Sequence, residues 1–497
     1  MLLEILITIG GNAMQQKKFA VIGHPIGHSM SPFIHQRLLK LAGVKGNYGI
    51  LDIPPEELSS RFSDTLVKLD GFNVTIPHKQ AILPLLNKVS GDAAAFGSVN
   101  TVALHGGKAI GYTTDGIGFT RALSAANLPL KGKVLLLGTG GVAHVLANEI
   151  LRAPGVASLT VVMRRHAEEI PCPTDNASEV DRKLGIRLAR ENAFIGSLNK
   201  PIMASFAARC PHGSVTVTDE TSLETKCTEG NAHFDLLVNG TSSGMYPKLG
   251  SCPVSPAVVS QCGAVFDAIY NPGLTMLLKY AKAQKIPCAG GMGMLVWQAA
   301  AAEEIWQSCR FHAEEVSPII HASSEAMRLR FGNIVLCGFM GCGKSTAGSI
   351  LAKQLGRQFI DMDTYIEQQT GMTVSEIFAK KGESWFRKKE KEVCRELSRK
   401  SGFVLAAGGG ALADPENAAV LRETGIIILL DPPYEGIVQR LADDHSRPML
   451  EKADRKAVMR RLYETRMPLY KAAADLTVSA ADSTVAAQQI ADFIPAS

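Results

Sequence analysis

A glycine-rich loop at residues 338–346 has the clearest chemical meaning in this chain. It reads Gly-Phe-Met-Gly-Cys-Gly-Lys-Ser-Thr, so a lysine and a serine directly follow a run of glycines. Glycines let backbone amides turn inward around phosphate oxygens, and a helix start adds positive partial charge. The lysine contacts the β- and γ-phosphates, and the serine hydroxyl ligates Mg²⁺. The predicted ligands are Gly338, Gly341, Gly343, Lys344, Ser345 and Thr346.

The residues around the loop predict the elements that position it. The apolar run Ile334–Cys337 predicts a strand before the loop, and the pattern Thr346–Lys353 predicts a helix after it. This strand–loop–helix context separates a phosphate-binding loop from a chance glycine turn. The loop alone does not distinguish a kinase from an ATPase or a GTPase. The chain has no Asn-Lys-x-Asp signature, which argues against a GTPase.

Carboxylates and basic residues follow the loop along the chain. Asp361 and Asp363 are expected on an extended segment, with their carboxylates pointing to opposite sides. One is predicted to face Mg²⁺ and the other the acceptor. Asp431 follows an apolar strand as a Walker-B aspartate does, and it is the alternative Mg²⁺ ligand. The glycines at 408–410 allow a close backbone approach to a ligand, and residues 445–448 suit a lid over phosphates.

A second group of polar residues lies in four turn-rich segments near the start of the chain. These segments are 23–32, 73–79, 98–101 and 113–116. Their hydroxyl and amide groups are suited to binding a polyol or a carboxylate. Lys79 and Asp115 form a candidate pair for proton transfer, in which the lysine is a general acid for a developing alkoxide.

The turn at 138–143, with Gly138, Gly140 and Gly141, follows the apolar run Lys133–Leu137 and opens a helical pattern. This context fits the first turn of a Rossmann unit. Arg164 and Arg165 follow the next strand, where an NAD site has an acidic residue for the ribose 2′-hydroxyl. Two arginines there suit a 2′-phosphate and favour NADP. The competing interpretation is a solvated basic turn.

Composition restricts the class of protein. The chain has 497 residues, 46% hydrophobic and 20% charged, which predicts two to four globular domains. Strand and helix patterns alternate nearly throughout, which predicts α/β architecture with parallel sheets. A net charge of +5 without a basic block argues against nucleic-acid binding. The ten cysteines include no CxxC pair, which indicates reduced thiols in a cytoplasm. No apolar run is long enough to span a membrane, and residues 1–11 lack the basic start of a signal peptide.

Residues 17–310 resemble shikimate dehydrogenase. The motifs are GHPIGHSMSPFIH, NVTIPHK, GSVNT, TTDGIG, NGTSSGM, FDAIYNPGLT and GMGMLVWQAA. The resemblance implies that Lys79 and Asp115 are catalytic. Substrate would be held by Ser29, Ser31, Thr75, Asn100, Asp115, Tyr270 and Gln298. The cofactor would be lined by the glycine turn, Arg164, Arg165, Asn239, Thr241, Met245 and Gly291. Two positions depart from the family pattern: Thr113 replaces an asparagine, and His144 replaces a basic residue near the cofactor phosphate.

Residues 331–495 resemble shikimate kinase through DMDTYIE, GESWFRKKE, AAGGGA and SRPML. The resemblance implies that Asp361 and Ser345 hold Mg²⁺, and that Lys344 and Asp363 are catalytic, with Asp363 on the acceptor hydroxyls. Arg387 and Arg466 would clamp a carboxylate. Gly409 and Gly410 would offer backbone donors, and Arg447 would close over ATP.

Together the resemblances imply a domain order. An N-terminal extension (1–16) precedes a two-domain dehydrogenase (17–325), with an α/β substrate domain at about 17–118 and 275–310 and a Rossmann NADP domain at about 119–274. A P-loop domain like nucleoside-monophosphate kinases follows (326–497). The linker at 311–330 is expected to be a flexible coil, and residues 166–232 an irregular or inserted region.

The implied function is a bifunctional shikimate-pathway enzyme that uses NADP(H), ATP and Mg²⁺. It would reduce 3-dehydroshikimate to shikimate and phosphorylate shikimate to shikimate 3-phosphate, with no nucleic-acid or membrane partner. Two alternatives stay open at this point. One is a quinate/shikimate dehydrogenase that uses NAD, fused to the kinase. The other is a catalytically dead sensor of the pathway. The sequence also leaves the oligomeric state open.

Overall fold

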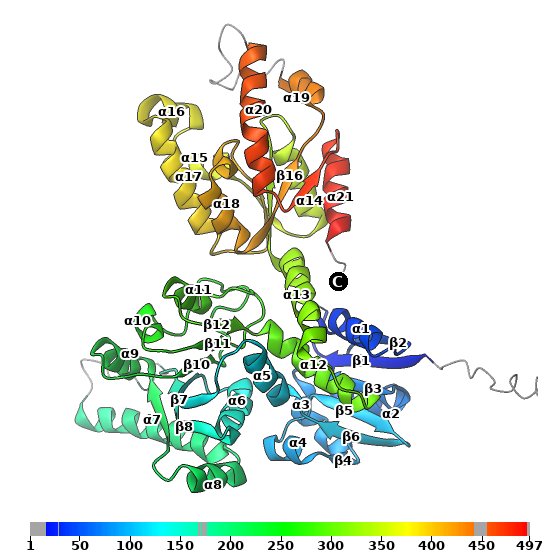
Figure 1. The fold of residues 1–497 in the computed structure, drawn as a ribbon. Helices are drawn as coiled ribbons and strands as arrows, with labels where there is room; N and C mark the ends of the chain where they lie inside the picture. Colours follow the sequence, from blue (N-terminus) through cyan, green and yellow to red (C-terminus); the bar gives the residue numbers. More distant parts are fainter. Residues whose placement is uncertain (1–15, 28, 167–168, 170–175, 442–454, 495–497) are drawn as a thin grey trace, which may run out of the picture.

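Three sheets organise the chain, each covered by helices (Figure 1). The computed structural model describes residues 16–27, 29–166, 169, 176–441 and 455–494. The predicted N-terminal extension therefore lies almost wholly outside the described residues. Among the described residues, no helix is both long and apolar enough to cross a bilayer.

The first sheet has the strand order β2-β1-β3-β5-β6-β4. Its elements are β1 (Lys17–Gly23), α1 (Ser31–Leu41), β2 (Gly46–Asp52), α2 (Leu58–Asp64), β3 (Gly71–Val74), α3 (His78–Ala81), β4 (Lys88–Val89), α4 (Gly91–Phe96), β5 (Thr101–His105), β6 (Lys108–Tyr112) and α5 (Asp115–Ala125). Strand β5 runs antiparallel to both of its neighbours, so this sheet is mixed and not purely parallel as expected. Helix α12 (Met292–Gln307) returns to this lobe and packs on α5 and α1.

The second sheet, β12-β11-β10-β7-β8-β9, is parallel throughout. Its elements are β7 (Lys131–Leu137), α6 (Gly141–Arg152), β8 (Gly155–Met163), α7 (Ala177–Ser197), α8 (Lys200–Arg209), β9 (Ser214–Asp219), α9 (Glu220–Thr228), β10 (Leu236–Asn239), α10 (Pro256–Val259), β11 (Val265–Asp267), α11 (Met276–Ala283) and β12 (Cys288–Gly290). The expectation of an irregular region at 166–232 was wrong, because three helices and a strand fill most of it.

The third sheet, β14-β15-β13-β16-β17, is also parallel. Its elements are β13 (Asn333–Cys337), α14 (Lys344–Gln354), β14 (Gln358–Asp361), α15 (Met362–Thr370), α16 (Val374–Lys381), α17 (Glu383–Leu397), β15 (Phe403–Ala406), α18 (Pro415–Arg422), β16 (Gly425–Leu430), α19 (Tyr434–Leu441), α20 (Arg455–Ala473), β17 (Leu476–Val478) and α21 (Ser483–Phe493). Every residue of β13, β15 and β16 is buried, as expected for strands covered on both faces.

The expected flexible linker is a helix. Helix α13 (Ala313–Phe331) begins at a capping box between His312 and Glu315 and runs to the residue before Gly332 (Figure 1). Its buried side chains Val316, Ile319, Ala326 and Met327 join the core of the first two lobes. A short apolar stripe was therefore present, and the expectation of a coil was wrong. The predicted boundary near residue 325 falls inside this helix.

Two further contacts join the third domain to the second lobe. Lys279 of α11 forms an ion pair of 2.8 Å with Glu423, beyond α18. A side chain at Gly402, just before β15, would meet the hydroxyl of Tyr246 at 3.4 Å, so the tyrosine ring lies against this glycine. The dehydrogenase-like and kinase-like parts of the chain are therefore in contact through these residues as well as through helix α13.

Cutting the chain inside α13 should destabilise the N-terminal half. Fragment 1–325 loses Ala326, Met327 and Phe331, which pack in or against its core, whereas fragment 1–332 keeps them. Because truncating one buried methionine alone costs about 2–5 kcal/mol, we expect the melting midpoint of 1–325 to lie about 5 °C or more below that of 1–332. Calorimetry of the two fragments measures this, and equal midpoints would contradict the packing role of α13.

Candidate active sites

Four predicted residues of the first lobe meet in one cluster. Lys79 of α3 donates to the Asp115 carboxylate at 2.7 Å, and both side chains are mostly buried. Asn100 donates its amide to the other Asp115 oxygen at 2.8 Å and lies 3.5 Å from the Gln298 carbonyl oxygen. One oxygen of the Asp115 carboxylate therefore accepts from the Lys79 ammonium group, and the other accepts from the Asn100 amide. This arrangement holds an ammonium group, which can act as a proton donor, in a fixed position.

The orientation of Asn100 is fixed by two threonines. Its side-chain oxygen accepts from the hydroxyls of Thr101 and Thr114 and from the Thr114 amide, at 2.9–3.2 Å. Its amide nitrogen must therefore face Asp115. Gln298 comes close because α12 packs tightly on α5, where a side chain at Gly118 would meet the Met294 carbonyl oxygen at 2.7 Å.

The remaining predicted substrate residues lie at the ends of neighbouring elements in the chain. The Ser29 hydroxyl accepts from the Ser31 amide at 3.1 Å at the start of α1. Thr75 lies just before α3, and Tyr270 follows β11 with 39% of its surface exposed. Burial raises the pKa of Tyr270, so its hydroxyl stays protonated and can donate a hydrogen bond.

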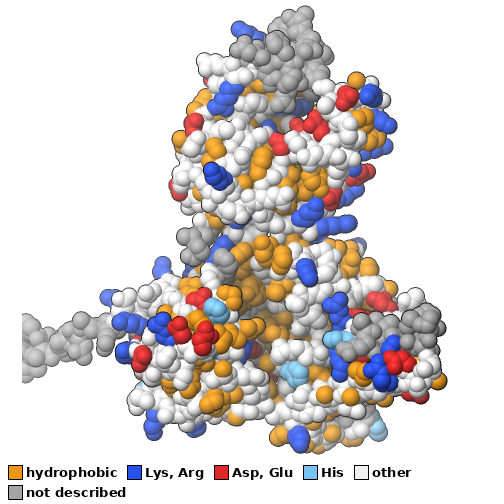
Figure 2. Space-filling model, turned by 180° about the vertical axis from the view of Figure 1, so that it is seen from behind, with side chains coloured by type: hydrophobic (Ala, Val, Ile, Leu, Met, Phe, Trp, Pro, Cys, Tyr) orange, Lys and Arg blue, Asp and Glu red, His pale blue; other side chains and the backbone are white. Residues whose placement is uncertain are grey.

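The glycine turn after β7 has the geometry of a phosphate site. Gly138 has φ +103°, where a side chain would strain the backbone and meet Thr241. No neighbouring atom lies within 4 Å of where side chains at Gly140 and Gly141 would begin, so the turn is open at these two positions. No side chain caps the start of α6. A free helix start beside open glycines suits a pyrophosphate. Figure 2 shows a hollow between the two lower lobes, with hydrophobic side chains along it.

The loop after β10 is held by a buried network. Asn239 is fully buried, donates to Asp267 at 2.9 Å and accepts from the amide and hydroxyl of Thr241. Burial raises the pKa of Asp267 despite its three hydrogen bonds. Asn239 therefore holds this loop in place from the protein interior. Met245, in the same loop, is exposed. Gly291 is also buried, packed against the Ala268 carbonyl, so its contact in this structure is with the protein.

The two predicted arginines after β8 differ in their contacts. Arg164 is exposed, and among the described residues it forms no ion pair within 4.0 Å. Arg165 lies 3.1 Å from buried Asp219, which also binds Arg187 at 2.7 Å. Burial alone would raise the pKa of Asp219, but hydrogen bonds from Ser222 and the positive charges of Arg187 and Arg165 hold this pKa below its usual value. Arg165 therefore links the end of β8 to the end of β9 through Asp219. Arg164 is the arginine whose side chain is available to a ligand.

The loop between β13 and α14 adopts an inward-turned conformation. Gly338, Gly341 and Gly343 all have positive φ, between +74° and +141°. Lys344 reaches back over the loop and donates to the carbonyls of Gly338 and Phe339 at 3.0 and 3.2 Å. These distances place its ammonium group at the mouth of the loop, where phosphate oxygens bind.

The two predicted carboxylates do diverge, but not on an extended segment as expected. Asp361 ends β14 and caps α15, so Asp363 stands in the first turn of a helix. Asp361 accepts from the Ser345 hydroxyl at 2.6 Å, whereas Asp363 approaches Gly408. A hydroxyl and a carboxylate suit Mg²⁺, which keeps several waters and phosphate oxygens as further ligands. Asp431 instead accepts from Tyr463 at 3.2 Å and lies 3.5 Å from Lys471.

The predicted carboxylate clamp gathers around Gly408–Gly410. Arg387 of α17 lies against Gly410, and Arg466 of α20 donates to the Gly409 carbonyl at 3.2 Å. Gly409 therefore acts here through its carbonyl, which also accepts from Tyr470, and not only through a donor as expected. Arg447 lies outside the described residues.

The sequence interpretation missed Glu390 as a site residue. Its side chain is 1% exposed, one oxygen accepts from Arg387 at 2.5 Å, and the other has no hydrogen-bond partner. That free oxygen lies beside Asp363 at Gly408. Burial raises the pKa of Glu390, and Asp363 adds to the shift while Arg387 opposes it. The spacing of Arg387 and Glu390, one helical turn apart, was the signal available.

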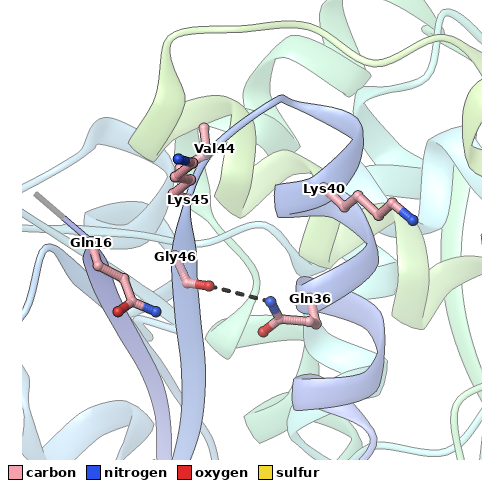
Figure 3. A pocket seen from close by; sticks show the side chains of 6 residues that line it. All are labelled: Gln16, Gln36, Lys40, Val44, Lys45 and Gly46. Carbon is pink, nitrogen blue, oxygen red and sulfur yellow. Dashed lines mark hydrogen bonds between the residues drawn. The ribbon is translucent and has the colours of Figure 1, made fainter. Parts of the chain in front are cut away.

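A cavity of about 560 Å³ lies away from both clusters, at the edge of the first sheet beside β2 (Figure 3). Gln36 of α1 donates to the Gly46 carbonyl across it at 3.2 Å. None of the predicted site residues lines it, so it has no part in either cluster.

Comparison with known proteins identifies the first half. A family model described as the shikimate dehydrogenase substrate binding domain matches residues 21–102. Shikimate dehydrogenase (NADP(+)) of Caldanaerobacter subterraneus is 32% identical over 292 residues, which covers 58% of this chain and 91% of the relative. This chain belongs to the shikimate dehydrogenase family. The relative from Methanococcus maripaludis is also 32% identical, with the same coverage.

A solved structure supports the same fold. The chorismate mutase/shikimate 5-dehydrogenase fusion protein from Clostridium acetobutylicum is 28% identical, with a TM-score of 0.50, and the match covers 63% of this chain and 98% of that one. The second half matches the shikimate kinase family model over residues 340–495. The chain is therefore a shikimate dehydrogenase fused to a shikimate kinase domain, as the sequence motifs predicted.

Proposed function

We propose that this chain is a bifunctional enzyme that reduces 3-dehydroshikimate to shikimate with NADPH and then transfers the γ-phosphoryl group of ATP to the 3-hydroxyl of shikimate. The observation that carries the proposal is that one chain holds two complete clusters. The first joins Lys79, Asp115 and Asn100 by hydrogen bonds. The second places Lys344 over the phosphate loop and joins Ser345 to Asp361. The dead-sensor alternative would require losses in these clusters.

In the dehydrogenase half, NADPH supplies the hydride, and the chain supplies the proton. Lys79 gives its proton to the keto oxygen as negative charge develops there, and Asp115 orients the ammonium group before this transfer. Ser29, Ser31 and Thr75 bind the carboxylate side of the substrate. Asn100 and Gln298, 3.5 Å apart, bind its hydroxyls and so orient the keto group toward Lys79.

In the kinase half, ATP·Mg²⁺ supplies the phosphoryl group. Lys344 and the loop amides bind the phosphate oxygens, and Ser345 and Asp361 hold the metal. Asp363 accepts hydrogen bonds from the acceptor hydroxyls and orients the attacking one. Arg387 and Arg466 bind the carboxylate, and Glu390 holds Arg387 in place through their 2.5 Å contact. Both halves thus bind the same small acid.

The cytoplasm is the compartment that we propose. All nine cysteines that the structure describes are free, as a reducing compartment requires.

A coupled assay tests the proposal. The purified chain, 3-dehydroshikimate, NADPH and ATP·Mg²⁺ should oxidise NADPH and yield shikimate 3-phosphate, identified by its mass. Parallel reactions with NADH and with quinate test the alternative in the first half. Failure to form shikimate, or failure to phosphorylate added shikimate, would refute the corresponding half.

Arg387→Ala should weaken shikimate binding and leave ATP binding unchanged. A charge-assisted contact with a carboxylate is worth roughly 1.5–3 kcal/mol, so we expect the shikimate Kd to rise about 10–100-fold. Calorimetric titration with each ligand measures this. Arg395→Ala is the matched control, because Arg395 lies on the same helix and pairs with Glu416 at the surface. Loss of ATP affinity in Arg387→Ala would move this residue to the nucleotide side.

A further inference from the structure

Helix α7 forms one wall of the nucleotide cleft, although it lies in the segment that was expected to be irregular. A cavity of about 280 Å³ separates it from the glycine turn. Thr139 and His144 line the cavity from the turn and α6, and Met163 lines it from the end of β8. The last turns of α7 close the remaining side, and Arg190 lies among them.

The position of α7 relative to the glycine turn is fixed by His144. Its ring hydrogen-bonds the Ser197 hydroxyl at 2.6 Å and packs 4.6 Å from the ring of Phe194, both at the end of α7. Its other ring nitrogen lies 3.0 Å from the Gly140 carbonyl oxygen. Phe194 is buried in the same core as α6. The cavity wall that carries Arg190 is therefore anchored to the turn itself.

Arg190 reaches the strand end at which a Rossmann domain recognises the ribose 2′-position. One terminal nitrogen lies 3.4 Å from the carbonyl oxygen of Arg164, the residue directly after β8. The other pairs with Glu169, whose side chain is 1% exposed. The guanidinium is itself 31% exposed and lines the cavity. A guanidinium has five donor N–H groups, so these two contacts leave donors for a further ligand.

Two neighbouring arginines are already paired with a carboxylate and are therefore less available to a phosphate. Arg165 and Arg187 are both bound to buried Asp219, and Arg187 also pairs with Glu191 at 2.8 Å. Glu220 lies near Arg164 and interacts with its charge. Arg190 therefore lines the cavity, and Arg164, next to it at the strand end, is exposed and forms no ion pair within 4.0 Å among the described residues.

We infer that Arg190 is a second specificity residue for the 2′-phosphate of NADP(H), acting beside Arg164, so that α7 helps to set cofactor preference. The inference rests on the proposed dehydrogenase function. The 2′-phosphate carries close to two negative charges, and an arginine contacts a phosphate bidentately. Glu169 holds the guanidinium in place before the nucleotide binds.

Binding measurements without substrate test this assignment. Arg190→Gln in the full chain should raise the Kd of NADPH and of adenosine 2′,5′-bisphosphate about tenfold and leave the Kd of NADH unchanged. Fluorescence titration measures the two dinucleotides, and calorimetry the bisphosphate. Arg182→Gln is the matched control, because Arg182 lies on the same helix, contacts Glu179 and does not line the cavity. It should change none of these constants.

A double variant separates recognition from folding. Arg190→Gln leaves Glu169 buried without its cation, so Arg190→Gln/Glu169→Gln should restore stability and keep the selective loss of NADPH affinity. Equal loss of NADPH and NADH, or no loss of either, would overturn the assignment. If the wild-type chain reduces 3-dehydroshikimate while the variants show no selectivity change, only the role of Arg190 fails. If the wild-type chain binds no NADPH, both proposals fail.

Discussion

Lys344→Ala should abolish phosphoryl transfer while shikimate formation continues. Lys344 spans the phosphate loop through the carbonyls of Gly338 and Phe339, and its ammonium is the charge that the loop can present to the β- and γ-phosphates. Removing one preorganised electrostatic contact to a developing charge costs on the order of 10²–10³ in kcat. We expect a loss at least this large, measured as ADP release with saturating shikimate and ATP.

Two controls make the result specific. Lys353→Ala removes an exposed lysine from the last turn of the same helix, α14, and should leave both activities unchanged. NADPH oxidation by Lys344→Ala should equal that of the wild type, because the loop lies in a separate sheet from Lys79. Kinase turnover within tenfold of the wild type would mean that Lys344 shapes the loop without acting on phosphate.

Local sequence alone was enough to predict the phosphate loop and the buried strands of its sheet. Strands β13, β15 and β16 are uninterrupted apolar runs because helices cover both faces of their sheet. The glycines of 338–343 occupy positions where a positive φ is required, so their spacing carries the loop conformation. Such features depend on near neighbours along the chain and can be predicted from a short window.

The helices α7 and α13 were missed for a different reason. The buried face of α13 includes the polar Ser323, and Pro318 lies inside the helix, so its apolar stripe is weak; its stability comes from packing on α12 and α1. On α7, Val180, Leu184 and Leu188 are exposed while Lys183 is buried, so its apolar residues do not mark the packed face. Tertiary contacts override local pattern in both helices.

The same limit applies to the candidate sites. Asp361 was expected on an extended segment, although an aspartate followed within three residues by a helical pattern is also an N-cap. The structure has this cap, and it carries Asp363 into α15. Contacts between distant residues, such as Asn100 with Gln298, have no local signal at all. The polar turn at 98–101 marked Asn100 as a candidate ligand, whereas Gln298 was named only through the family resemblance, and the roles of both in binding remain proposals.

Lys79→Ala should reduce hydride transfer by at least about two orders of magnitude, the usual scale for loss of a general acid. The Nζ of Lys79 lies 2.7 Å from Asp115, and no other lysine or arginine in the described part of the chain forms an ion pair with this aspartate. Without it, the alkoxide that forms on reduction must take its proton from water. Stopped-flow measurement of NADPH oxidation with saturating 3-dehydroshikimate reports this step.

The Lys79–Asp115 pair also predicts whether the loss of activity in Lys79→Ala appears in kcat or in KM. Asn100 and Asp115 stay hydrogen-bonded when Lys79 is removed, so the hydroxyl-binding side of the site should persist and KM should change less than kcat. Lys68→Ala, at an exposed position of the same lobe, should behave as the wild type, and kinase turnover should be unaffected. A variant in which KM rises and kcat is preserved would show that Lys79 binds the substrate without protonating it, and the proton donor would have to be sought elsewhere in the cluster.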